Sequence, residues 1–191
     1  MNTLIRNTLF FSIFFPLVLT FVSCSQVNID KELLLIDSLQ TMIVEAERKS
    51  KEIDIESIRT YKEAMEDQLN LFKTQYSDSI SWESAKFLNR YHAIKKSFHK
   101  YLDKNIRFED EITYSHDQLK NLKHDLEENI IHLDTFKRNF TVELLAVKDL
   151  KILIDKEVEN LKNKLEEYRE ANPKVEELIK KLKSAKDSIR D

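Results

Sequence analysis

The sequence predicts an all-α protein, an elongated antiparallel helical bundle with coiled-coil-like heptad seams. Glycine is absent from all 191 residues, and Pro173 is the only proline beyond the N-terminal segment. Sheets turn their hairpins mainly with glycine-containing dipeptides, so this composition disfavours strands. Apolar residues instead recur at steps of three and four with a mean of about 3.5, the heptad value of a left-handed supercoil.

The first helix is predicted over residues 30–76. Two apolar series at heptad spacing support it, and the polar segment Lys49–Glu52 separates them. We interpret this segment as a phase shift within one long helix, with a break between two helices as the alternative. The two series are Ile29, Leu33, Ile36, Leu39, Ile43 and Ala46, then Ile55, Ile58, Tyr61, Met65, Leu69, Phe72 and Tyr76.

Two further helices are predicted over residues 80–104 and 109–171. Residues 77–81 carry serine and aspartate, which favour turns and N-caps, so a turn should precede the second helix. Residues 103–108 are predicted to turn again, and the acidic run 109–111 suits the first turn of a helix. The seam of the third helix consists of Leu119, Leu122, Leu126, Ile130, Leu133, Phe136, Phe140, Leu144, Val147, Leu150, Ile154, Val158, Leu161, Leu165 and Tyr168.

Asn172 and Pro173 predict the last boundary, because asparagine suits an N-cap and proline the first helical position. The final helix is therefore predicted over residues 173–190. We expect the first helix to run outward, the second to return, and the third to extend past both, with the fourth folded back along its end. The bundle of residues 31–191 should thus be a rod with a thin distal tip.

The N-terminal segment has the features of an export signal. Arg6 precedes an apolar run over residues 9–19, which Pro16 interrupts and which is short for a membrane span. The run closes on Phe21-Val22-Ser23-Cys24. This tetrapeptide resembles the lipobox of bacterial lipoproteins, although phenylalanine stands where leucine is usual. The alternatives are an ordinary cleaved signal peptide and an uncleaved anchor.

The lipobox resemblance implies removal of residues 1–23 and attachment of lipid, such as palmitate, to Cys24. Residues 24–30 would then be the lipidated cysteine and a short tether. Cys24 is the only cysteine of the chain, so no disulfide within the chain competes for it. The resemblance places the protein in the bacterial cell envelope, and Ser25 after the cysteine favours the outer membrane. The expected partner is therefore the membrane, bound through the lipid on Cys24.

The composition disfavours several classes of function. Thirty-one basic residues nearly balance 34 acidic ones, which argues against a nucleic-acid partner. None of the five histidines follows a glutamate by three positions, the spacing that di-iron helical bundles require. A phosphate-binding loop needs glycine, which the chain lacks. We therefore expect no catalytic residue, no metal, no cofactor and no small-molecule substrate.

A wide apolar surface at residues 142–154 is the one candidate interaction site. Val142, Leu145 and Leu153 extend it beyond what a two-helix seam can bury. We expect either the first helix or a second protomer to cover it. The predicted function is a membrane-anchored structural or protein-interaction module, and the alternative is a periplasmic holdase-type chaperone that binds unfolded clients.

Overall fold

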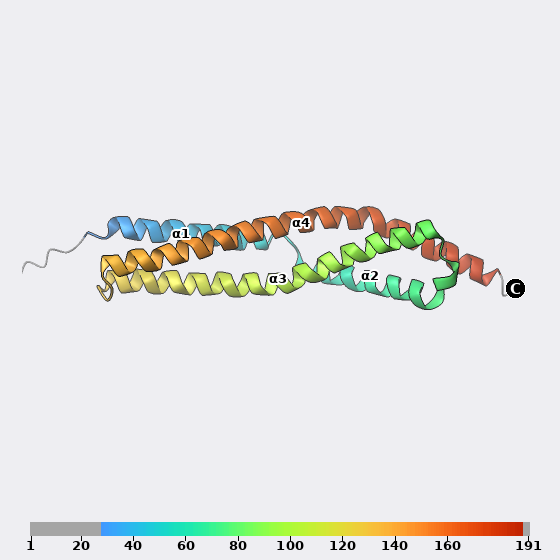
Figure 1. Ribbon diagram of the computed structural model, residues 1–191, viewed down its shortest axis with the longest axis horizontal. Coiled ribbons are helices and arrows are strands. Elements are labelled where there is room, and N and C mark those ends of the chain that lie inside the picture. The colour runs from blue at the N-terminus through green and yellow to red at the C-terminus, as the bar shows by residue number, and fades with distance from the viewer. Residues whose placement is uncertain (1–27, 189–191) are drawn as a thin grey trace, which may run out of the picture.

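The computed structural model describes residues 28–188, and within them it contains helices and turns but no strand. The helices are α1 (Asp30–Ser50), α2 (Ile55–Gln75), α3 (Trp82–Glu127) and α4 (Leu133–Asp187), with a 3-10 turn, η1 (Ser77–Ser79), between α2 and α3. Figure 1 shows an elongated bundle in which these helices run along one long axis. The predicted all-α fold is confirmed.

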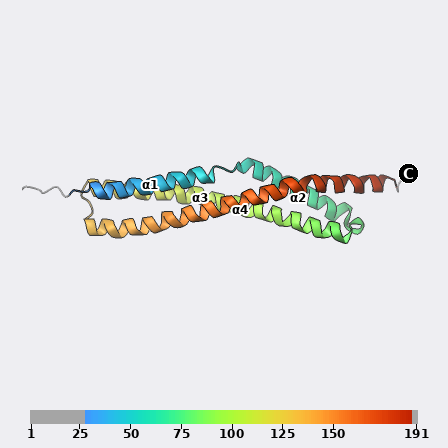
Figure 2. The same cartoon turned by 90° about the horizontal axis from the view of Figure 1, so that it is seen from above.

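The bundle is built on α3 and α4, which are antiparallel over most of the rod (Figures 1 and 2). Helices α1 and α2 follow one another along this pair, so that α1 completes one half of the rod and α2 the other. Ion pairs mark the packing of α1 on its neighbours, since Lys123 of α3 lies 2.9 Å from Asp37. In the other half, Gln68 of α2 donates a hydrogen bond to Asn172 of α4 at 3.2 Å.

The predicted single helix over residues 30–76 is wrong, and the alternative of a break is confirmed. The chain leaves the α1 helix after Ser50 and re-enters a helix at Ile55. Asp54 caps α2, because its carboxylate accepts hydrogen bonds from the Glu56 amide at 3.1 Å and the Ser57 hydroxyl at 2.6 Å. Ile53 is buried in the intervening linker and anchors it to the core.

The predicted turn at residues 103–108 is also wrong, since α3 is continuous from Trp82 to Glu127. Two polar residues, Asn105 and Ser115, occupy buried positions of the helix and interrupt the apolar pattern without interrupting the helix. The Asn105 amide donates to the Glu109 carboxylate at 2.8 Å, which satisfies one of its polar groups. The buried row is Leu88, Tyr91, Ile94, Phe98, Tyr101, Asn105, Phe108, Ile112, Ser115, Leu119, Leu122 and Leu126.

The chain reverses direction inside the region predicted as a helix over residues 109–171. The turn follows Glu127, where Asn129 adopts a left-handed conformation with φ 55°. Asparagine tolerates this conformation better than most residues and is favoured just past helix ends. The amide of Ile130 donates to the Asp125 carbonyl at 2.8 Å and closes the end of α3. Ile130, expected in the seam, is instead 63% exposed at the turn.

The expected helix boundary at Pro173 is absent, because α4 continues through it to Asp187. Asn172 does not act as an N-cap. Its amide donates to the Glu176 carboxylate at 2.8 Å, and its side-chain oxygen accepts from Gln68. No helix folds back along the end of the rod in residues 28–188, so the expected thin tip is replaced by a three-helix arrangement along both halves.

Candidate interaction surface

The outer face of α4 carries large apolar side chains that the bundle does not cover. Val142 is 64% exposed, Leu145 58%, Ile152 66% and Leu153 43%. The same stretch of helix sends Val147 and Ile154 into the core, where they are 1% and 0% exposed. Because a helix turns by about 100° per residue, the exposed set lies on the side of α4 opposite the core. We call these four exposed residues the outer strip.

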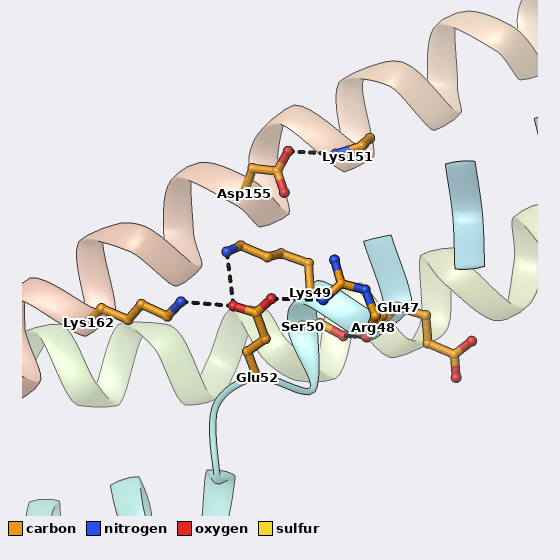
Figure 3. A network of polar contacts seen from close by, with 8 residues as sticks. All are labelled: Glu47, Arg48, Lys49, Ser50, Glu52, Lys151, Asp155 and Lys162. Atoms are coloured by element: carbon orange, nitrogen blue, oxygen red, sulfur yellow. Dashed lines mark hydrogen bonds and ion pairs between the residues drawn. The ribbon is translucent and has the colours of Figure 1, made fainter. Parts of the chain in front are cut away.

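The structure places all three sequence-predicted interface residues on the outer strip. Helix α1 packs against α4, but it leaves Val142, Leu145 and Leu153 accessible. The expectation that the first helix covers them is therefore wrong. Figure 3 shows the end of α1 on the side of α4 that carries Lys151, Asp155 and Lys162. The outer-strip side chains, on another side of the helix, stay exposed.

Two opposite charges lie in line along the outer strip. Asp149 and Lys156 are seven residues apart, so they share one face of α4 at about 10 Å separation along the axis. Within residues 28–188, neither forms an ion pair. By contrast, Lys151 and Asp155 pair at 2.8 Å on the side of α1, and Glu157 pairs with Lys104 of α3 at 2.6 Å. Sequence reasoning missed this pair of charges, although their heptad spacing is visible in the sequence.

A groove of about 300 Å³ lies beside Val142, between α3 and α4. Its walls are mostly polar and include Gln118, Asn121 and Asn139. Glu143 also lines it, and partial burial raises the pKa of that carboxyl above its ordinary value. The groove gives the outer strip a polar edge, an arrangement typical of protein contact surfaces with an apolar centre and polar rim.

A second polar feature holds the linker between α1 and α2 (Figure 3). The Glu52 carboxylate accepts hydrogen bonds from Lys49 at 2.9 Å and from Lys162 of α4 at 2.8 Å, with Arg48 at 3.2 Å. The hydrogen bonds from Lys162 and Lys49 lower the pKa of Glu52 to about 2. A carboxyl that stays ionised to such low pH serves as an electrostatic tie and is poorly suited to general acid catalysis.

The interior of the other half contains a small polar cluster among aromatic rings. The Tyr91 hydroxyl lies 2.6 Å from the side-chain oxygens of both Gln68 and Asn172, and it can donate to one of them at a time. Burial raises the pKa of Tyr91 above its ordinary value. The ring of Tyr168 stacks on Tyr61 with centroids 4.8 Å apart. These contacts join α2, α3 and α4 and fix their register.

The remaining candidates for chemistry are dispersed. His99 lies 3.7 Å from Asp103 in an exposed pair on α3. Among residues 28–188, no three histidine, cysteine or acidic side chains are grouped as a metal site would require. Cys24, the predicted lipidation site, lies outside the described residues. No helix in the described part of the chain is long and apolar enough to cross a membrane.

Comparison with known protein families, with curated proteins and with solved structures finds no match to this chain.

Proposed function

We propose that this protein is a lipid-anchored helical module of the bacterial envelope that binds another protein through the outer strip. Cys24 would hold it at the membrane, and α4 would present Val142, Leu145, Ile152 and Leu153 to the partner. The observation that carries the proposal is the accessibility of these four side chains on one face of one helix. Exposed large apolar side chains that gather on one face and have polar neighbours mark interaction sites in soluble domains.

The character of the described residues supports binding over catalysis. The rod offers long helical faces, and the strongest pKa shift of an acidic group, at Glu52, is toward lasting ionisation by ion pairing. The grooves between its helices are lined by a mixture of polar, charged and apolar side chains. We therefore assign no reaction to the protein and no cofactor.

The anchor is tested by metabolic labelling in a bacterial host. Wild-type chain should incorporate labelled palmitate and fractionate with membranes, because several acyl chains hold a protein stably in a bilayer. Cys24→Ser should lose the label, and Ser23→Ala is the matched control because alanine also suits the position before the cysteine. Absence of label from the wild type would refute the anchor.

The binding surface is tested by photocrosslinking in intact cells. A photoreactive residue at Leu145 should give one or a few discrete products, whereas the same residue at Lys183, exposed near the end of α4, should give none. Many products of unrelated unfolded proteins would instead indicate the holdase-type alternative. A lack of products at Leu145 would contradict the proposed surface.

A further inference from the structure

The outer strip has a charge pattern that can complement itself. Asp149 and Lys156 lie on one row of α4 at heptad spacing, with Ile152 and Leu153 between them along the helix. Both apolar residues are exposed, and within residues 28–188 neither charge has an ion-pair partner. The two charges cannot pair with each other, because about 10 Å of helix separates them. A second helix with the opposite order of charges would satisfy both.

We propose that the partner of the outer strip is a second copy of this chain, whose α4 packs antiparallel to the first. The twofold axis would pass between Ile152 and Leu153. Facing residues then have numbers that add up to 305, the sum of 152 and 153. Asp149 therefore faces Lys156 of the second copy, and Lys156 faces its Asp149. This proposal rests on the proposed function, because it identifies the protein that binds the outer strip.

The charges distinguish this arrangement from a parallel one. In a parallel pair in register, Asp149 would face Asp149 and Lys156 would face Lys156, so both contacts would be repulsive. In the antiparallel pair both contacts are attractive, and they flank a centre made of Ile152 and Leu153 from each copy. Leu145 would lie level with Asn160 of the second copy, a neutral side chain that tolerates an apolar neighbour.

The size of the contact indicates a weak association. From Val142 to Asn163 the paired helices would touch over about 32 Å at 1.5 Å per residue. One helix on one helix covers less than the roughly 800 Å² per partner of a standard stable interface. We therefore expect a dimer that forms and dissociates with protein concentration, which suits a protein held at high local density on a membrane.

The antiparallel pair also has a consequence for anchoring. Residue 133, at the start of α4, would lie level with residue 172 of the second copy, so the two starts of α4 would be about 58 Å apart. The N-terminal ends of the two rods would point in opposite directions. If Cys24 is lipidated as proposed, both anchors reach a single membrane when the paired rods lie along its surface.

Charge reversal of the full chain in a mild detergent tests the proposal. Light scattering should show a concentration-dependent dimer for the wild type. Asp149→Lys and Lys156→Asp should each raise the dimer dissociation constant by about tenfold or more, because two attractive contacts become repulsive. An equimolar mixture of the two variants should regain the wild-type constant within about threefold, because each charge then meets its opposite across the interface. Lys183→Asp, at a distant exposed position of α4, should change nothing.

The outcomes separate the alternatives. Single variants that keep the wild-type dissociation constant would indicate parallel pairing or another surface and would overturn the antiparallel arrangement. A wild-type chain that stays monomeric up to about 0.5 mM would overturn self-association altogether. If that monomer still crosslinks to a different protein through Leu145 in cells, the interaction function stands and only its proposed partner is wrong. Circular dichroism of every variant confirms that the helices are intact.

Discussion

The ammonium nitrogen of Lys162, in the middle of α4, lies 2.8 Å from the carboxylate of Glu52 in the α1–α2 linker. The contact joins residues 110 positions apart in the sequence. It fixes the linker through which the chain passes from α1, in one half of the rod, to α2, in the other half (Figure 3). Lys49 adds a second cation, so the linker is held to α4 by charge as well as by the buried Ile53.

Glu52→Gln should therefore destabilise the protein at neutral pH. The pKa of Glu52 is about 2 in the folded chain, below its ordinary value of 4.5. A lowered folded pKa contributes stability that is present above the unfolded value and is lost as pH falls through the folded value. The difference in unfolding free energy between wild type and variant should thus be constant above about pH 5 and shrink toward pH 2. Urea unfolding at several pH values measures it.

The control for this prediction is Glu63→Gln. Glu63 is exposed on α2 and, within the described residues, forms no ion pair. Its replacement should leave the unfolding free energy nearly unchanged at every pH, as surface substitutions usually do. An equal loss in both variants would show that the Glu52 contacts contribute no specific stability.

Two buried tyrosines give opposite expectations for the same substitution. Tyr91→Phe removes a hydroxyl that contacts the half-buried side chains of Gln68 and Asn172 and leaves both with fewer partners, so it should cost about 1 kcal/mol. The Tyr101 hydroxyl is buried and finds no hydrogen-bond partner among residues 28–188, and burial raises the pKa of Tyr101 to about 12. Tyr101→Phe should therefore be neutral or stabilising.

Thermal and denaturant unfolding of the two phenylalanine variants tests this contrast directly. Each substitution removes one oxygen from a similar ring, so the pair controls for the loss of the hydroxyl itself. A larger loss of stability at Tyr101 than at Tyr91 would mean that the roles of the two hydroxyls are reversed.

The loss of stability on replacing leucine by aspartate should follow how deeply each leucine is buried. Leu126 is 2% exposed at the end of α3, and Leu126→Asp should cost about 3–5 kcal/mol, because it places an unpaired carboxylate in the core. Leu144 is only partly buried on α4, so Leu144→Asp should cost less. Leu145→Asp, on the outer strip, should have almost no effect on the unfolding of the isolated chain. Equal tolerance of all three substitutions would contradict the described packing.

The sequence predicted the helical class, most of the core and the turn at residues 77–81, but it misplaced the other turns. In α3, Asn105 and Ser115 continue a buried row that apolar residues alone do not reveal, and so the apolar pattern suggested a turn where the helix continues. At residues 128–132 the apolar spacing runs on through Ile130 and Leu133 although the chain reverses there. A chain without glycine marks its turns weakly, and in this turn it is Asn129 that adopts the left-handed conformation.

The sequence identified the apolar residues of the outer strip, but the expectation that the first helix would cover them was wrong. Val142, Leu145 and Leu153 were recognisable because they exceed the apolar face that one seam needs. Which side of α4 receives α1 depends on packing between segments about 100 residues apart, such as Asp37 with Lys123 and Glu52 with Lys162. Periodicity within one helix carries no information on that choice.

Pro173 supplies the last prediction. It lies inside α4, where proline lacks the amide that would donate to the carbonyl four residues earlier, and its ring crowds the preceding turn. Pro173→Ala should restore an amide that donates to the Arg169 carbonyl and stabilise the protein, by up to about 3 kcal/mol if the helix otherwise keeps its path. Lys174→Ala, at the exposed next position, controls for the added alanine. A loss of stability in Pro173→Ala would show that the shape proline imposes on α4 is needed to bring Asn172 to Gln68 and Tyr91.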